Sequence, residues 1–322
     1  MVPQSLILRD KMNITLEKIV NSDGVGLITS IAHGSLGEKD PCYYVSAGGG
    51  LFTVSDDMRS VEQIEGIKDV SMVKFGHERK LYALINNQVV EVLPDGFELG
   101  DVLCEVPEIL GRERTYEFNA QFFFNVWHHK YIHFILNFGM ELKEMVIVGM
   151  ELKNKEPKIL YRETPKGCNM KATIDHDGHI YIAKWFYMAG KGVTLGTGGA
   201  PVHLQLSCGD SRGGYNIVFD EEIGTYRYPN SIKDLEIDPR GFVWMIPDSQ
   251  KEGKEEHRGI FLDLCKDASF SEVRFPYEPV GRGQAQPIRM FFVDHDHLVV
   301  ASQHQFEGLR LVKYKIDYKQ NS

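Results

Sequence analysis

The sequence predicts an all-β protein, a six-bladed β-propeller with four antiparallel strands in each blade. Three observations support this prediction. Short runs rich in Tyr, Val, Ile and Trp alternate with polar turns along the chain, and helical periodicity is scarce. The same unit recurs six times, at intervals of roughly 40 to 60 residues. The last unit is one strand short, and a strand-like segment near the N-terminus could complete it.

The repeat is clearest in two segments, IDHDGHIYIAKW (174–185) and IDPRGFVWMIPD (237–248). Each places a D-x-x-G turn between two strands, with Gly178 and Gly241 free to adopt a positive φ. Weaker copies begin at Ile31, Val73, Phe124 and Val293. The copy at Phe124 contains WHHKYIH (127–133), so its first histidines are expected in a turn and His133 in the following strand.

We expect one domain spanning residues 1–322. The approximate blades are 24–66, 67–110, 111–164, 165–224, 225–278, and 279–322 together with 1–23. The last repeat supplies the strands PIRMFFV, LVVASQ and GLRLVKYKID, and the N-terminal NITLEKIV is expected to add the fourth. Sharing a blade in this way would pair two otherwise open strand edges and join the termini.

The composition predicts a cytoplasmic protein with no membrane or nucleic-acid partner. The net charge of −9 disfavours a surface that binds phosphate backbones. No apolar run approaches the roughly 18 residues of a membrane-spanning helix. The five cysteines are scattered without a C-x-x-C pair, which favours reduced thiols over a disulfide framework or a zinc knuckle.

Alternating strands would place the turns after the inner strands on one face of the ring. Eight histidines fall at or beside these turns: His33, His77, His128, His129, His176, His179, His295 and His297. They belong to different blades, and packed sheets lie about 10 Å apart, so they are not expected to converge on one ion held at about 2 Å. We interpret them as solvated turn residues.

The opposite face carries the candidate site. Amide and cationic side chains stand just ahead of, or at the start of, the inner strands of the later blades, and they could converge at the mouth of the channel. They are Asn119, Asn169, Asn230, Arg282, Gln284 and Gln286. Amides suit a hard cation or a polyhydroxylated ligand, although an Asn ahead of a strand also commonly caps a turn.

The stretch YPNSIKDLEIDPRGFVWMIPD (228–248) and the D-x-x-G turns resemble the six-bladed superfamily of NHL-repeat, gluconolactonase-like and yellow-like proteins. The resemblance implies the fold. Gluconolactonases hold a divalent ion with Asn and acidic ligands, and Asn119 and Asn169 are similar to that family's asparagines. The spacing to the following turn differs, however, and Asp234, the nearest acidic candidate, is offset in register. The resemblance thus implies only part of the ligand set for Ca²⁺, Mg²⁺ or Mn²⁺.

Two function classes follow. The first is a binding or scaffolding propeller that engages a partner protein or a small ligand at the channel mouth, beside the glycine-rich loop 183–203. The alternative is a metal-assisted hydrolase of lactone or ester type, with Asn119, Asn169, and Asn230 or Asp234 around a divalent ion. No G-x-S-x-G or H-E-x-x-H motif is present, and the sequence assigns no catalytic residue.

Overall fold

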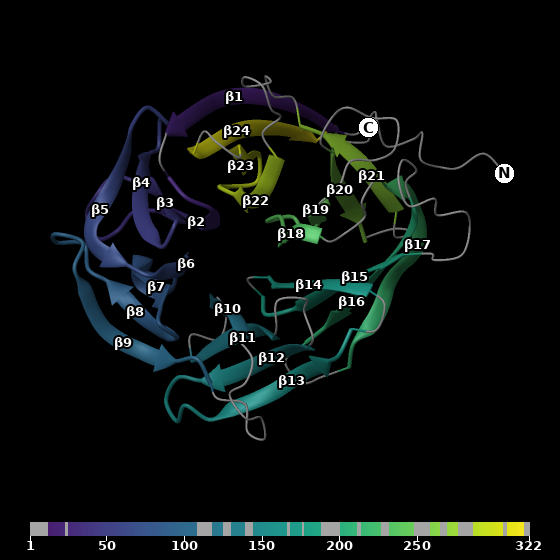
Figure 1. Ribbon diagram of the computed structural model, residues 1–322, viewed down its shortest axis with the longest axis horizontal. Helices are drawn as coiled ribbons and strands as arrows, with labels where there is room; N and C mark the ends of the chain where they lie inside the picture. The colour runs from purple at the N-terminus through teal and green to yellow at the C-terminus, as the bar shows by residue number, and fades with distance from the viewer. Residues whose placement is uncertain are drawn as a thin grey trace.

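Six four-stranded antiparallel sheets surround a central axis in the computed structural model, which confirms the six-bladed propeller (Figure 1). The structure describes residues 12–22, 25–107, 118–124, 130–138, 144–165, 168–175, 177–187, 200–210, 214–226, 232–247, 258–264, 269–275, 286–304 and 308–318. Within these ranges the sole helical element is one 3₁₀ turn, His77–Arg79. No helix in the described part of the chain is long and apolar enough to cross a lipid bilayer.

The first three blades follow one another along the chain, each running from the axis outward. Their strands are β2 (Ile28–Gly34), β3 (Cys42–Ala47), β4 (Gly50–Ser55) and β5 (Val61–Lys68); β6 (Val70–Phe75), β7 (Leu81–Ile85), β8 (Gln88–Val92) and β9 (Leu99–Glu105); and β10 (Phe118–Phe124), β11 (Tyr131–Phe138), β12 (Glu144–Glu151) and β13 (Pro157–Glu163). His133 lies inside β11, as predicted, whereas residues 125–129 lie outside the described ranges.

The next two blades have the same order, and the sixth takes its outer strand from the start of the chain. Their strands are β14 (Cys168–Ile174), β15 (Ile180–Tyr187), β16 (Ala200–Gly209) and β17 (Asn216–Tyr226); β18 (Ile232–Ile237), β19 (Val243–Pro247), β20 (Arg258–Asp263) and β21 (Ser269–Arg274); and β22 (Gln286–Phe292), β23 (His297–His304), β24 (Gly308–Tyr318) and β1 (Met12–Ser22).

Strand β1 closes the ring, as the N-terminal alternation predicted. It pairs antiparallel with β24, from Met12 opposite Tyr318 to Ser22 opposite Leu309. The edge of β24 is therefore paired, and β1 becomes the outer strand, with alternately exposed and half-buried residues along its first half. The ring is held at this point by main-chain hydrogen bonds between the two ends of the chain.

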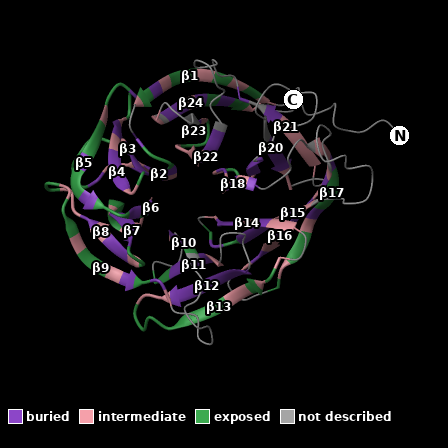
Figure 2. Ribbon diagram, in the orientation of Figure 1, coloured by how far each residue is buried: buried purple, intermediate pink, exposed green. Residues whose placement is uncertain are grey.

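The core lies between the blades, where the middle strands are largely buried, whereas the outer strands are mostly exposed or half-buried (Figure 2). Trp185 and Trp244 are completely buried in second strands. The first seven residues of β12 are all buried, because both faces of this middle strand pack on neighbouring blades. The apolar β-branched and aromatic runs of the sequence become this core.

The D-x-x-G turns have a common side-chain design. Asp238 accepts the N–H groups of Arg240 and Phe242 on one oxygen, each at 2.9 Å. Its other oxygen accepts from Trp244 Nε1 at 3.1 Å and from the Tyr318 hydroxyl at 2.8 Å. Gly241 follows with φ of 89°, and Gly178 of the fourth blade has φ of 85°, which confirms the expected positive φ at both glycines.

Candidate functional site

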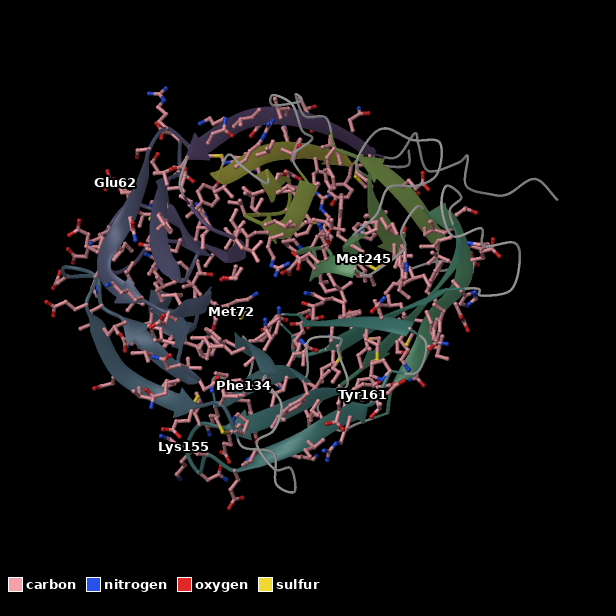
Figure 3. All side chains as sticks on the ribbon, viewed as in Figure 1. Glu62, Met72, Phe134, Lys155, Tyr161 and Met245 are labelled. Carbon is pink, nitrogen blue, oxygen red and sulfur yellow. The ribbon has the colours of Figure 1, made fainter. Side chains whose placement is uncertain are left out.

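One position on each inner strand faces the axis and forms a ring of six side chains. The strand registers identify the equivalent residues as Ser30, Met72, Gln121, Lys171, Asp234 and Arg289. Met72 lies beside the axis, whereas Glu62 and Lys155 lie at the outer rim (Figure 3). Chemically different residues thus occupy one structural position, and the ring is strongly asymmetric.

Hydrogen bonds between neighbouring blades confirm this equivalence. The Ser30 hydroxyl accepts the N–H of Val73 at 2.7 Å. Asp234 Oδ2 accepts the N–H of Met290 at 2.7 Å. The Met72 sulfur accepts the N–H of Phe122 at 3.3 Å. In each case the axial side chain of one blade accepts a hydrogen bond from a backbone N–H of the next inner strand, so these residues also join the blades.

Bulges determine which residues reach the axis. The register shifts by one residue near the start of β2, β6, β18 and β22, whereas β10 and β14 pair without interruption. A bulge inserts one unpaired residue and turns the following side chains to the other side of the strand. In β18 the shift lies between Ile232 and Asp234, and beyond it Asp234 occupies the position equivalent to Lys171 in β14.

The ring lines an axial cavity of about 30 Å³, enough for about two water molecules. Five charged side chains reach it: Lys74, Lys171, Asp234, Glu236 and Arg289. Uncharged polar contributions come from Thr29, Ser30, Gln121 and Thr173. The centre of the propeller is therefore a narrow polar space with ionisable groups on four inner strands, β6, β14, β18 and β22, whereas β2 and β10 contribute none.

Arg289 holds three blades together. Its Nε donates to the Thr29 carbonyl of β2 at 2.9 Å. Its Nη1 donates to the carbonyl of Lys233 in β18 at 3.0 Å and to that of Ile288 at 2.7 Å. The residues that carry these carbonyls stand at the bulges, where the strand register skips one residue. The guanidinium is thereby fixed in place beside the axis.

Burial shifts two of the charged groups toward neutral pH. It lowers the pKa of Lys171 to about 8, an effect that the Arg289 charge reinforces and that Asp234 and Glu236 oppose. It raises the pKa of Glu236 to about 7; Asp234 adds to this rise, while Lys74, Lys171 and Arg289 oppose it. A group that exchanges a proton near pH 7 inside a cavity is typical of a functional site.

Four of the seven predicted site residues lie in described strands: Asn119, Asn169, Asp234 and Gln286, the last of which begins β22. Asp234 reaches the cavity. Asn119 and Asn169 stand two residues before Gln121 and Lys171, so they lie on the axial side of β10 and β14, one layer nearer the face where the strands begin. Asn230, Arg282 and Gln284 lie outside the described ranges, and the convergence of the asparagines remains a prediction.

Sequence reasoning missed Lys74, Gln121, Lys171, Glu236 and Arg289. A usable signal was present, since CNMKATI and PIRMFF each place one cation inside an otherwise largely apolar inner strand. A charge at such a position is rare unless it faces a cavity or a partner. The asparagines predicted from the sequence, Asn119 and Asn169, lie one layer nearer the start of the inner strands than this cavity.

On the opposite face, Asp175, Asp177 and His179 offer ligand atoms within 4.8 Å of one another in the turn of the fourth blade. Asp175 already accepts the N–H groups of Asp177 and His179, at 2.9 and 2.8 Å. The same arrangement recurs in the sixth blade, where Asp294 accepts from Asp296 and His297. The cluster is therefore explained by turn formation.

The fold and the axial cavity define this protein as a six-bladed propeller with an ionisable centre. Its fold is shared with a gluconolactonase from Xanthomonas campestris, at 11% identity over 96% of this chain and 95% of that one, with a TM-score of 0.51. An α-L-arabinofuranosidase from Fusarium graminearum, solved with an iminosugar inhibitor, is 10% identical over 96% and 98%, with a TM-score of 0.54. An oligogalacturonate lyase in complex with manganese is 8% identical over 95% and 98%, with a TM-score of 0.51.

These identities show a common fold and confirm the resemblance to gluconolactonase-like propellers at that level. No protein-family model and no curated protein sequence matches the chain. The function must therefore be argued from the site itself.

The residues around the cavity do not suit a divalent cation. Lys74, Lys171 and Arg289 line the same small space as the two carboxylates, and their charges would repel a metal ion. Asp234 already uses one oxygen to accept the Met290 N–H. A hard cation prefers six or more oxygen ligands, and ammonium and guanidinium groups supply none.

Proposed function

We propose that this protein binds a small polar ligand in its axial cavity, with access from the face where the inner strands begin. The observation that carries the proposal is the set of five charged side chains that four blades direct at one cavity. Burying charge is costly, and a propeller needs only apolar packing near its axis to be stable. A bound ligand of complementary charge accounts for the presence of these buried charges.

Two asparagines support access from the face where the inner strands begin. Asn119 and Asn169 lie on the axial side of their strands one layer above the cavity, and Asn119 is exposed. Their amides could contact the part of a ligand that extends out of the cavity. The predicted partner-protein role of the glycine-rich loop remains a prediction, because residues 188–199 lie outside the described ranges.

Blocking the cavity tests the proposal. Gln121 lines it, and a Gln121→Trp variant would fill it, whereas Gln63→Trp places the same residue on the exposed outer strand β5. Polyols, monosaccharides, carboxylates and phosphate would be screened by thermal shift and confirmed by calorimetry. We expect at least one class to bind the wild type and Gln63→Trp but not a folded Gln121→Trp or the smaller Gln121→Phe. Equal binding by the blocked variants would contradict the proposal.

The metal-assisted hydrolase is the second candidate, favoured by a propeller of the same fold that was solved with manganese. Because the charged cavity does not suit a cation, the ion would have to lie above it, at Asn119 and Asn169. Elemental analysis of the purified protein and of Asn119→Ala and Asn169→Ala tests this candidate. Stoichiometric Ca, Mg or Mn that both substitutions remove would support it, and its absence would exclude it.

A further inference from the structure

The five charged side chains of the cavity act on one another through space, but they are not paired directly. In the part of the chain that the structure describes, no ion pair joins any two of them. Lys171 and Glu236 make neither a hydrogen bond nor an ion pair. Lys74 lies over the Phe123 ring, with its Nζ 4.8 Å from the ring centroid. Elsewhere in this protein, half-buried charges are paired directly, as Lys184 is with Glu163 at 2.7 Å.

The charges are also unequal in number. Three side chains are cationic and two are carboxylates, so the lining carries a net charge of +1 when all five are ionised. Partial protonation of Glu236 near neutral pH makes the balance more positive. This excess stands out because the whole chain carries a net charge of −9. The centre of an acidic protein is therefore locally basic.

The cationic groups have free donors directed at one space. Arg289 uses Nε and Nη1 for the three backbone carbonyls, and its Nη2 donates to none of the described residues. Lys171, in the strand register equivalent to Arg289, has no hydrogen-bond partner within the described ranges. A guanidinium held rigidly and an ammonium with free donors together form a receptor for an oxyanion.

We infer that the cavity takes the oxyanion of a small ligand, a carboxylate or a phosphate, between the Lys171 ammonium and the Arg289 guanidinium. Glu236 faces the same space, where it accepts a hydrogen bond from a ligand hydroxyl or donates one when protonated. This inference rests on the proposed function and specifies the chemical class of the ligand. The cavity volume limits the buried part of the ligand to its charged group and the atoms next to it.

Proton binding should be linked to anion binding. An anion beside Lys171 favours its charged form and therefore raises its pKa from about 8, so the complex takes up protons. Ionisation of Glu236, with its pKa near 7, adds a negative charge that opposes the ligand. The other charged groups that face this space are Lys74, Arg289 and Asp234, which accepts the Met290 N–H. Both titrations consequently predict that affinity falls as the pH rises from 6.5 to 9.

The test is isothermal titration calorimetry with matched ligands at pH 7. Lactate carries one carboxylate, lactamide is its neutral counterpart, and inorganic phosphate represents phosphate esters. The variants are Lys171→Met, with Lys171→Gln as a second choice if the first does not fold, and the control Lys158→Met on the exposed strand β13. We expect lactate or phosphate, but not lactamide, to bind the wild type and Lys158→Met. We expect at least about tenfold weaker binding to Lys171→Met.

The outcomes separate the inference from the proposed function. Equal binding of lactate and lactamide, abolished by Gln121→Trp, would leave the cavity as a binding site and overturn its preference for anions. Anion binding that Lys171→Met does not weaken would place the anion elsewhere and also overturn the inference. If neither the anions nor neutral polyols bind, both proposals fail. Preference for lactate over phosphate, or the reverse, identifies which oxyanion the cavity takes.

Discussion

His133 predicts how the stability of this protein depends on pH. Its side chain is 2% exposed within the core of the third blade, and its Nδ1 has no hydrogen-bond partner in the described structure. Gly149, opposite His133 in the next strand, provides the space for the ring: a Cβ at that position would lie 3.5 Å from the imidazole Cδ2. The imidazole is thus surrounded by protein without a group that would stabilise its charge.

Burial lowers the pKa of His133 from 6.5 to about 4. The unfolded chain therefore binds a proton at a pH where the folded chain does not, and the free energy of unfolding decreases as the pH falls below 6.5. The full effect of the shift is about 3 kcal/mol, reached below pH 4. Linkage gives a loss of about 1.4 kcal/mol at pH 5.5 and about 2.5 kcal/mol at pH 4.5.

Urea denaturation followed by tryptophan fluorescence measures this dependence at pH 7.5, 6.5, 5.5 and 4.5. In His133→Leu, which keeps an apolar side chain of similar size, this part of the pH dependence should disappear. His295→Gln, at an exposed turn, should keep the wild-type profile. Parallel profiles for the wild type and His133→Leu would show that the imidazole is protonated in the folded state, and they would refute the reasoning.

Three further predictions concern the links between blades. Asp234→Ala leaves the buried Met290 N–H unsatisfied and should lower the free energy of unfolding by about 1–3 kcal/mol, whereas Asp234→Asn should keep most of it; equal losses in urea denaturation would exclude this role. Asp238→Ala removes an acceptor of four hydrogen bonds and should cost about 3 kcal/mol, against about 1 kcal/mol for the half-exposed Asp294→Ala; the two melting curves should therefore separate clearly. Deleting residues 1–22 exposes the edge of β24 and should lower the Tm or produce oligomers in light scattering; a monomer of unchanged Tm would contradict the closure.

The fold could be predicted because its signals are local. Alternation over five to eight residues marks a strand wherever it occurs, and the D-x-x-G turns of Asp175 and Asp238 form through their own side chains. The closure by β1 followed from counting strands in the last repeat. None of these inferences required knowledge of how the blades meet.

The site could be predicted only in part, because it depends on register. Lys171 and Arg289 reach one cavity since β14 pairs without a bulge while β22 has one, and nothing in the sequence marks the inserted Ile288. A shift of one residue exchanges the axial side of a strand for the side that packs on a neighbouring blade. Asp234 likewise follows a bulge in β18, which a reading of the sequence alone does not locate.

The pairing of β1 with β24 also has a consequence for the synthesis of the protein. Met12 emerges from the ribosome about three hundred residues before its partner Tyr318. Strand β1 therefore cannot pair until β24 has been synthesised. The five blades in between are continuous in sequence and can form from local hairpins as they appear. The sixth blade requires the longest loop closure in the molecule and is expected to form last and most slowly.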